Sequence, residues 1–253
     1  MDKIKQACQL IKNSSKVMAL TGAGISTDSG IPDFRGKNGY YKDMDPVRSL
    51  SKDRLLNEPE KFYKEGYKIL LDLNSKKSNK GHLALAKMEK MGLIKGIITQ
   101  NIDNLHYKAQ SSNIYEVHGE TRGIHCMDCG KTYPFELLKE KVDQGQIPPK
   151  CTCGGTLRPN VVMFGDMMPK DFEDAIDEME DTDTLIVVGT SLTVSPVNML
   201  PRYADNLIII NQSPTPYDHH ADIVFHENSS EVLSKILEEL EKNDLQWICP
   251  SLR

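Results

Sequence analysis

A short apolar run that ends in a glycine-rich turn constrains the fold of this chain more than any other feature. The run Val17 to Leu20 is typical of a buried strand, and the sequence Thr-Gly-Ala-Gly-Ile-Ser-Thr-Asp-Ser-Gly-Ile-Pro-Asp-Phe-Arg-Gly follows it at 21–36. Gly22 and Gly24 allow a tight turn whose free amide groups, at the start of a helix, suit a pyrophosphate. A glycine-rich loop without a ligand is the alternative for the turn taken alone.

The same stretch departs from the dinucleotide fingerprint of a hydride-transfer enzyme. Thr27 stands at the third glycine position of Gly-x-Gly-x-x-Gly, and no second strand ending in an acid follows for the ribose. Instead, Asp33, Phe34 and Arg35 place an acid, an aromatic ring and a guanidinium beside the turn. We therefore expect a phosphate-binding turn that serves a chemistry other than plain hydride transfer.

The rest of the chain alternates apolar runs with amphipathic patterns. Strands are predicted for the apolar runs at 94–99, 114–117, 185–188, 207–210 and 222–225. Helices are predicted for the amphipathic stretches at 2–13, 53–73, 79–91, 171–179 and 231–240. Ser195 and Pro196 have the pattern of an N-cap followed by proline, which predicts a further helix to about Ala204. This alternation is typical of an α/β protein with a doubly wound, mostly parallel, Rossmann-like sheet.

Composition and charge disfavour several classes of protein. A net charge of -5 argues against direct nucleic-acid binding, and no apolar run approaches the roughly 20 residues of a membrane span. The segment Met1 to Lys5 does not have the apolar region of a signal peptide. We therefore expect a cytoplasmic protein without a membrane partner, whose six cysteines are metal ligands or thiols before they are disulfides.

Two close cysteine pairs form a metal-binding pattern. Cys126 and Cys129 precede Cys151 and Cys153, with glycines just after each pair. Four thiolates on two turns supply a tetrahedral site with no open position, so we expect a structural Zn²⁺; four unrelated buried cysteines are the alternative. The remaining cysteines, interpreted as small apolar residues or free thiols, are Cys8 and Cys249.

Polar residues follow several predicted strands, at the edge of the sheet where ligands of doubly wound folds bind. The stretch Thr99 to His106 has amide and acid side chains that suit a carboxamide such as that of nicotinamide, or it is a helix start capped by Asp103. His118 ends the next strand and suits a general base, since an unperturbed histidine has a pKa of about 6.5. A purely structural His118, with His106 or His125 as the competing base, is the alternative.

Three later stretches each have a ligand-binding interpretation and a purely structural one. The segment 158–166 suits strand addition by an extended peptide, or it is an ordinary edge strand. The polar runs at 189–196 and 211–213 suit ribose and phosphate contacts, or they are simple turns after strands.

Together these motifs resemble the sirtuin family, the NAD-dependent protein-lysine deacylases, in its bacterial-type form. They stand in the family's order from about residue 15 to residue 235. The resemblance implies NAD as co-substrate, one structural Zn²⁺ per chain, and acyl-lysine proteins or peptides as partners. It also implies the reaction: nicotinamide leaves, the acyl oxygen captures the ribose C1′, and the products are free lysine, nicotinamide and O-acyl-ADP-ribose.

The resemblance implies roles for individual residues. The catalytic residues are His118, the general base for a ribose hydroxyl, with Asn101 and Asp103. The NAD-binding residues are Gly22, Ala23, Gly24, Thr27, Asp33, Phe34, Arg35, Gln100, Asn101, Ile102, Asp103, His118, Gly189, Thr190, Ser191, Asn211, Gln212, Ser213 and Ser229. The residues of the acyl-lysine tunnel and the peptide site are Val162, Phe164, Gly165, Asp166, Thr193 and Val194.

The resemblance further implies one catalytic domain, 1–253, in two parts. The large Rossmann-like part covers about 1–36, 78–120 and 159–245, and the small part covers about 37–77, which is helical, and 121–158, the zinc module. Mono-ADP-ribosyl transfer, which shares the first step, and an NAD- or ADP-ribose-binding module without turnover are the alternative functions.

Two sequence details concern the substrate. The family usually has Glu after Phe-Gly, and this chain has Asp166, which puts the peptide preference in question. Sirtuins that prefer acidic acyl groups resemble one another in a Tyr-x-x-Arg pair, and here Tyr63 is followed by Gly66 at the arginine position. We therefore expect a preference for short neutral acyl groups such as acetyl or propionyl.

Overall fold

The computed structural model describes residues 2–33 and 49–248. Its centre is a six-stranded sheet in which every neighbouring pair of strands is parallel. In spatial order the strands are β3 Ile114–Glu116, β2 Gly96–Thr99, β1 Val17–Thr21, β7 Thr184–Val188, β8 Asn206–Ile210 and β9 Ile223–Phe225. Counted along the chain, this is the order 3-2-1-4-5-6 of doubly wound dinucleotide-binding sheets, so the expected Rossmann-like fold is confirmed.

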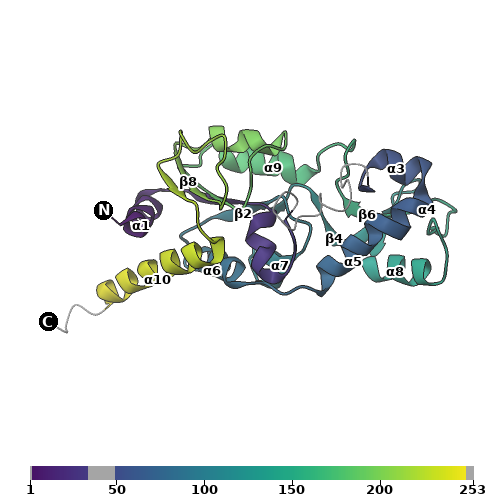
Figure 1. The fold of residues 1–253 in the computed structure, drawn as a ribbon, viewed down its shortest axis with the longest axis horizontal. Helices are drawn as coiled ribbons and strands as arrows, with labels where there is room; N and C mark the ends of the chain where they lie inside the picture. The colour runs from purple at the N-terminus through teal and green to yellow at the C-terminus, as the bar shows by residue number, and fades with distance from the viewer. Residues whose placement is uncertain (1, 34–48, 249–253) are drawn as a thin grey trace.

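Alternate residues of the parallel strands face two separate apolar cores. In β1, Val17 and Ala19 belong to one core, Met18 and Leu20 belong to the other, and all four are buried. Figure 1 shows α9 on one side of this sheet, with α6 and α10 on the other. The helices that surround the sheet are α1 Lys3–Asn13, the 3₁₀ helix η1 Ala23–Ser29, α6 Lys80–Lys90, α7 Leu105–Lys108, α9 Lys170–Met179, the 3₁₀ helix η4 Val197–Arg202 and α10 Ser229–Ile248.

A smaller antiparallel sheet lies at the end of the molecule opposite α1 and α10 (Figure 1). Its strands, in spatial order, are β5 Thr132–Pro134, β4 Gly119–Cys126 and β6 Leu157–Val161. The helices around it are α3 Lys52–Asn57, α4 Pro59–Lys61, the π-helix η3 Phe62–Gly66, α5 Tyr67–Ser75 and α8 Phe135–Asp143. A single apolar core joins α3, η3, α5 and α8 to β4 and β6, so the helical insertion packs on the cysteine module. The residue limits expected for the two parts stay a prediction.

One helix expected from the sequence is present in a shorter form and as a 3₁₀ helix. The segment from Ser195 to Ala204 contains the short 3₁₀ helix η4, and Pro196 occupies its N-cap position without a side-chain cap hydrogen bond. Pro201 lies inside η4 and has no amide hydrogen to donate, so an α-helical hydrogen-bond ladder cannot run through it.

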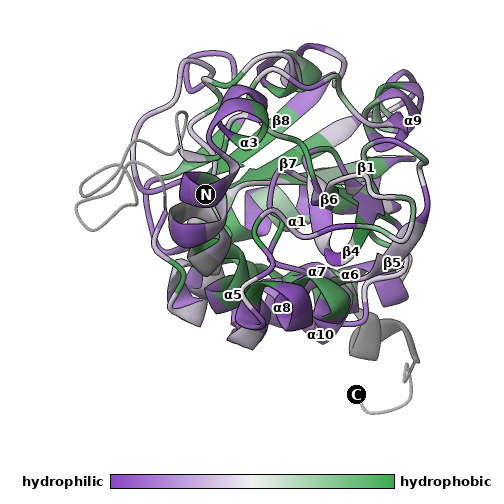
Figure 2. Ribbon diagram, turned by 90° about the vertical axis from the view of Figure 1, so that its right-hand side faces the viewer, coloured by the Kyte–Doolittle hydropathy of each residue, from purple (hydrophilic) through white to green (hydrophobic). Residues whose placement is uncertain are grey.

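Hydropathy follows these layers. In Figure 2 the central strands are largely in the hydrophobic colour, whereas outer helices such as α8 carry hydrophilic residues. Among residues 2–33 and 49–248, no helix combines the length and the apolar character needed to cross a membrane.

Candidate active site

The loops that follow β1 and β7 cross in close contact at the switch point of the parallel sheet. Gly24 N donates to Gly189 O at 2.8 Å, and Gly22 N donates to Val188 O at 3.0 Å. A Cβ on Gly24 would lie only 2.7 Å from Gly189 Cα, so the glycines let two backbones touch. The amides of Gly22 and Gly24 thus donate to Val188, the last residue of β7, and to Gly189, which follows it. The binding of a phosphate by this turn stays a prediction.

Buried polar side chains hold the loop after β2 against the loop after β1. Asn101 Nδ2 donates to Gly22 O at 3.0 Å and to Ser26 Oγ at 3.2 Å. Ser26 Oγ in turn donates to Asp103 Oδ2 at 2.6 Å. Asn101 and Asp103, both expected to be catalytic, thus meet around Ser26. Our sequence analysis did not single out Ser26, although its place in the Gly-Ala-Gly-Ile-Ser motif was the available signal.

Asp103 has a second, structural role. Its Oδ1 accepts from the amide of Leu105, the first residue of α7, at 2.9 Å, although the N-cap position of that helix is Asn104 and not Asp103. Burial raises the pKa of Asp103, and the hydrogen bonds from Ser26 and Leu105 oppose that rise. The carboxyl group is therefore fixed in place by donors on both oxygens.

His118 is half-buried just beyond the end of β3, with Nδ1 2.9 Å from Gln100 O. Because a carbonyl oxygen can only accept, Nδ1 carries the proton and Nε2 holds a lone pair. Burial lowers the pKa of His118 and the hydrogen bond to Gln100 partly opposes this, so the ring is neutral at pH 7. Gln100 Nε2 also donates to Thr190 Oγ1 at 3.0 Å, which links His118 to the loop after β7.

The two competing histidines have other surroundings. His106 is only 2% exposed, its Nε2 lies 2.9 Å from Thr21 Oγ1, and burial holds its pKa well below the usual value. His125 lies in β4, and its Nδ1 is 2.8 Å from Asn160 Oδ1. A ring as buried as that of His106 has no access to a substrate, so His118 is a better candidate for a general base than His106.

The remaining residues expected to bind NAD lie at the carboxyl edge of the sheet. In and after η1 they are Ala23, Thr27 and Asp33, whereas Phe34 and Arg35 fall outside the described residues. Ile102 follows β2, and Ser229 begins α10. The residues that follow β7 are Gly189, Thr190 and Ser191, and those that follow β8 are Asn211, Gln212 and Ser213. Asn211 Nδ2 donates to Ser213 O at 2.7 Å, so a turn structure accounts for part of this polar run.

The expected peptide segment lies directly beside His118. Val162 N donates to His118 O at 2.9 Å, and Phe164 is 47% exposed. Arg158 donates to both carboxylate oxygens of Asp166, at 3.1 and 2.6 Å, and Met163 N donates to the same group at 2.9 Å. The Asp166 carboxylate is therefore bonded to Arg158 and Met163, which lie a few residues before it in the same segment. Burial alone would raise the pKa of this carboxyl, but Arg158 and Met163 hold it below the usual value.

The last two residues expected at the peptide site are in the loop before η4. Thr193 is exposed and Val194 is half-buried. Thr193 Oγ1 lies 2.9 Å from Ser191 Oγ, which joins the expected peptide and NAD residues in one loop.

The four cysteines of the module come together as a metal site. Their Sγ atoms all lie within 4.8 Å of one another, with Cys126 and Cys153 3.5 Å apart and Cys129 and Cys151 3.8 Å apart. Four thiolates about 2.3 Å from a tetrahedral Zn²⁺ would be roughly 3.8 Å apart, so the set fits one structural zinc ion. The sequence analysis missed Tyr133, whose hydroxyl lies 3.1 Å from Cys151 Sγ and can donate to a thiolate.

Comparisons with known proteins agree with this site. The model of the Sir2 family matches residues 22–196. The NAD-dependent protein deacetylase 2 of Caldanaerobacter subterraneus subsp. tengcongensis is 54% identical over 234 residues, 92% of this chain and 94% of that protein.

Two solved structures share the fold at 36% identity, and each match covers 93% of this chain and 98% of the other. One is a Sir2 variant with a deacetylated p53 peptide and 3′-O-acetyl ADP ribose, at a TM-score of 0.89. The other is Sir2 with a p53 peptide and NAD⁺, at a TM-score of 0.86. The chain belongs to the Sir2 family, the sirtuins that its motifs resemble.

Proposed function

We propose that this protein is an NAD-dependent protein-lysine deacetylase. It takes an acyl-lysine protein or peptide, NAD⁺ and water, and gives the deacylated lysine side chain, nicotinamide and O-acyl-ADP-ribose. The observation that carries the proposal is the histidine at the end of β3, whose Nδ1 donates to Gln100 O and whose Nε2 can accept a proton. Two kinds of relative support it: one protein is named a deacetylase, and two solved structures are of Sir2 with NAD⁺ or an acetylated ADP-ribose.

In this proposal His118 is the general base. When bound, NAD⁺ supplies the ribose carbon that receives the acyl oxygen. His118 Nε2 then removes the proton from a ribose hydroxyl as that hydroxyl attacks the acyl carbon. Because burial lowers its pKa, His118 is already deprotonated at neutral pH and is ready to accept this proton.

Asn101 and Asp103 order the reacting region in this proposal. Each is tied to Ser26, so the loop after β2 keeps its shape before the substrates arrive. Gln100, Ile102 and Asp103 hold the ribose and the nicotinamide, and the loops after β7 and β8 hold the adenosine side. Gly22 and Gly24 let the β1 loop pack closely against the loop after β7, and in this proposal they form the turn beside the bound NAD⁺.

The smaller sheet completes the peptide site in this proposal. Val162 and Phe164 line the acyl-lysine tunnel, with the segments 165–166 and 193–194 on either side of the peptide. The zinc is structural because four sulfur ligands leave no open position. A thiolate zinc site needs a reducing compartment, which supports a location in the cytoplasm.

Nicotinamide release tests the proposal against its two alternatives. The protein is mixed with NAD⁺ and with an acetylated or unacetylated version of one peptide, and nicotinamide is followed over time. Release that requires the acetyl group supports deacetylation. Release without it indicates ADP-ribosyl transfer or hydrolysis, and no release in either case indicates a binding module.

A further inference from the structure

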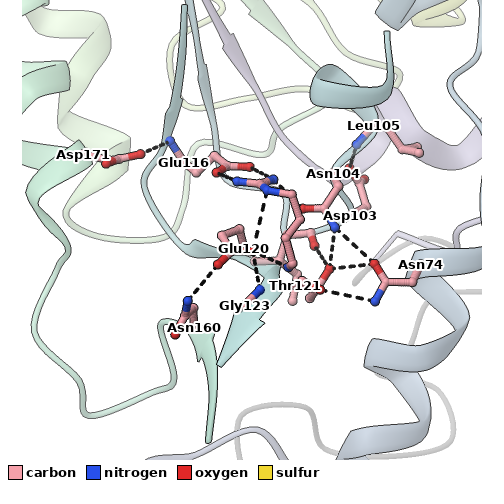
Figure 3. Close-up of polar contacts among 12 residues, drawn as sticks. Asn74, Asp103, Asn104, Leu105, Glu116, Glu120, Thr121, Gly123, Asn160 and Asp171 are labelled. Carbon is pink, nitrogen blue, oxygen red and sulfur yellow. Dashed lines mark hydrogen bonds and ion pairs between the residues drawn. The ribbon is translucent and has the colours of Figure 1, made fainter. Parts of the chain in front are cut away.

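A network of polar side chains lies where β3, β4, α5 and the loop after β2 meet. In Figure 3, Glu116, Asn104, Thr121 and Asn74 point toward one another, although they come from four separate segments of the chain. Glu116 is two residues before His118, and Asn104 directly follows Asp103. The network therefore joins the two stretches that carry the expected catalytic residues.

Arg122 of β4 makes the central contacts of this network. Its Nη1 donates to Glu116 Oε1 and to Asn104 Oδ1, both at 2.7 Å, and its Nη2 donates to Glu116 Oε2. The guanidinium carbon lies 4.9 Å from the centre of the Tyr107 ring. A planar guanidinium that grips both oxygens of a carboxylate fixes direction as well as distance.

Asn104 needs such support because of its backbone. Its φ of 62° and ψ of 15° are left-handed, a conformation that few residues other than glycine and asparagine adopt. Its Nδ2 donates to Thr121 Oγ1 at 2.7 Å and to Asn74 Oδ1 at 3.1 Å. Both polar ends of the Asn104 side chain are thus held, one by Arg122 and the other by β4 and α5.

Thr121 also holds the backbone of Ile102 by a hydrogen bond. Thr121 Oγ1 lies 2.9 Å from Ile102 O, and Asn74 Nδ2 donates to Thr121 O at 3.3 Å. The residues on either side of Asp103 are therefore both held from the smaller sheet and its helices. Asp103 itself is held from the other direction by Ser26.

We propose that Arg122 is a positioning residue that sets the loop of Asn101 and Asp103 relative to His118. The proposal rests on the deacetylase function given above. The Arg122 side chain is 36% exposed and is not a member of the apolar cores, so its removal leaves those cores intact. Its loss should therefore disturb the geometry of the site more than the folding of the protein.

Substitution of Arg122 by methionine tests this proposal, because methionine keeps an unbranched apolar stem and removes the guanidinium. We expect kcat for deacetylation to fall about 10-fold, with KM for the peptide within about 2-fold, because a small misplacement of reacting groups acts mainly on turnover. Arg122→Lys should remain impaired, because an ammonium cannot grip both Glu116 and Asn104 with a fork. The matched control is Arg202→Met, which removes an exposed guanidinium bonded to Tyr217 Oη and should leave kcat unchanged.

A double-mutant cycle with Glu116→Gln separates positioning from general damage. If Arg122 acts through Glu116, the double variant should lose little more than Arg122→Met alone, whereas independent effects would multiply. Fully multiplied effects would contradict the proposal.

Hydrogen–deuterium exchange without substrates tests the positioning apart from any activity. Arg122→Met should speed exchange of the amides at 101–105, whereas Arg202→Met should not. If the wild-type protein does not turn over acetyl peptide, the deacetylase function fails while this measurement still decides whether Arg122 holds the loop. Unchanged exchange at 101–105, or an unchanged kcat in an active enzyme, would overturn the proposal.

Discussion

The two sheets of this molecule are stabilised in different ways. The parallel sheet is buried on both faces by apolar cores, and its central residues Ile97, Ile186 and Val187 are fully buried. The antiparallel sheet has one core, and that core includes Cys126 and Cys151, two of the expected zinc ligands. The first region is thus stabilised by apolar burial on two faces, whereas we expect the second to gain part of its folding free energy from a bound zinc ion.

Polar groups are divided between the regions in the same way. The loops after β1, β2 and β7 place their buried polar side chains at one edge of the parallel sheet, where Asn101, Asp103 and His118 lie. The loops of the antiparallel sheet carry the sulfur cluster and the exposed Phe164. In the proposed function, the reacting residues therefore lie on the parallel region, and the metal-binding region shapes the peptide site.

The largest expected effect comes from His118→Ala, a change confined to the edge of the parallel region. Deacetylation should fall by about 100-fold or more, because the general base is lost. The free energy of unfolding should hardly change, since the ring is only half-buried and makes one hydrogen bond. Steady-state kinetics and urea unfolding measure the two quantities. Binding of NAD⁺ and peptide should persist in this variant, and near wild-type turnover would remove His118 from the mechanism.

Loss of zinc should affect the second region selectively. Cys126→Ser removes a ligand that is buried in the core of the antiparallel sheet, so zinc content should fall and that region should unfold. Helical signal from the parallel region should survive in circular dichroism. Cys8→Ser is the matched control, because Cys8 is buried in the other region and lies outside the metal cluster. A fully folded Cys126→Ser protein with one zinc per chain would contradict the claim that the antiparallel region depends on zinc bound by Cys126.

The acyl preference depends on the second region and should be a smaller effect. Tyr63 is buried and its hydroxyl donates to Leu157 O at 2.6 Å, so it is not presented to a bound acyl group. Gly66, which stands at the position of the arginine in acid-preferring sirtuins, has no charge to offer a buried carboxylate. The value of kcat/KM should be higher for acetyl and propionyl lysine than for succinyl lysine in one peptide. Equal removal of succinyl would require a cation in the tunnel.

The smallest expected effect is the pH dependence of the first region. Burial lowers the pKa of His118, so its basic form persists as the pH falls to about 6.5, the usual histidine value. The acid limb of kcat/KM should therefore lie below pH 6.5. An acid limb centred above pH 7 would mean that another group is the base.

The sequence predicted the strand segments, the parallel fold class and the metal cluster because these follow from local patterns. The apolar run before Gly22 and the spacing of Cys126 and Cys129 are readable within a few residues. The contact of Gly24 with Gly189 cannot be predicted from a local pattern, because it depends on how two distant loops cross. Pro201 lies inside the segment expected to be helical, so the 3₁₀ form of η4 could have been anticipated from the sequence.

The contacts of the site that the sequence did not predict also depend on the three-dimensional fold. Ser26 bridges Asn101 and Asp103, which are far from it in the chain. Arg122 and Glu116 are close in sequence, but a strand pattern alone does not show that both turn toward Asn104. Residue roles can thus be expected from motifs, whereas the contacts that fix those residues needed three dimensions.

The central claim is that this chain couples deacetylation to consumption of NAD⁺. The most direct measurement is a product balance by mass spectrometry, with an acetyl-lysine peptide, NAD⁺ and the wild-type protein. The account predicts equal amounts of deacetylated peptide, nicotinamide and O-acetyl-ADP-ribose at every time. Nicotinamide accompanied by ADP-ribosylated protein or peptide, with the acetyl-lysine intact, would contradict it.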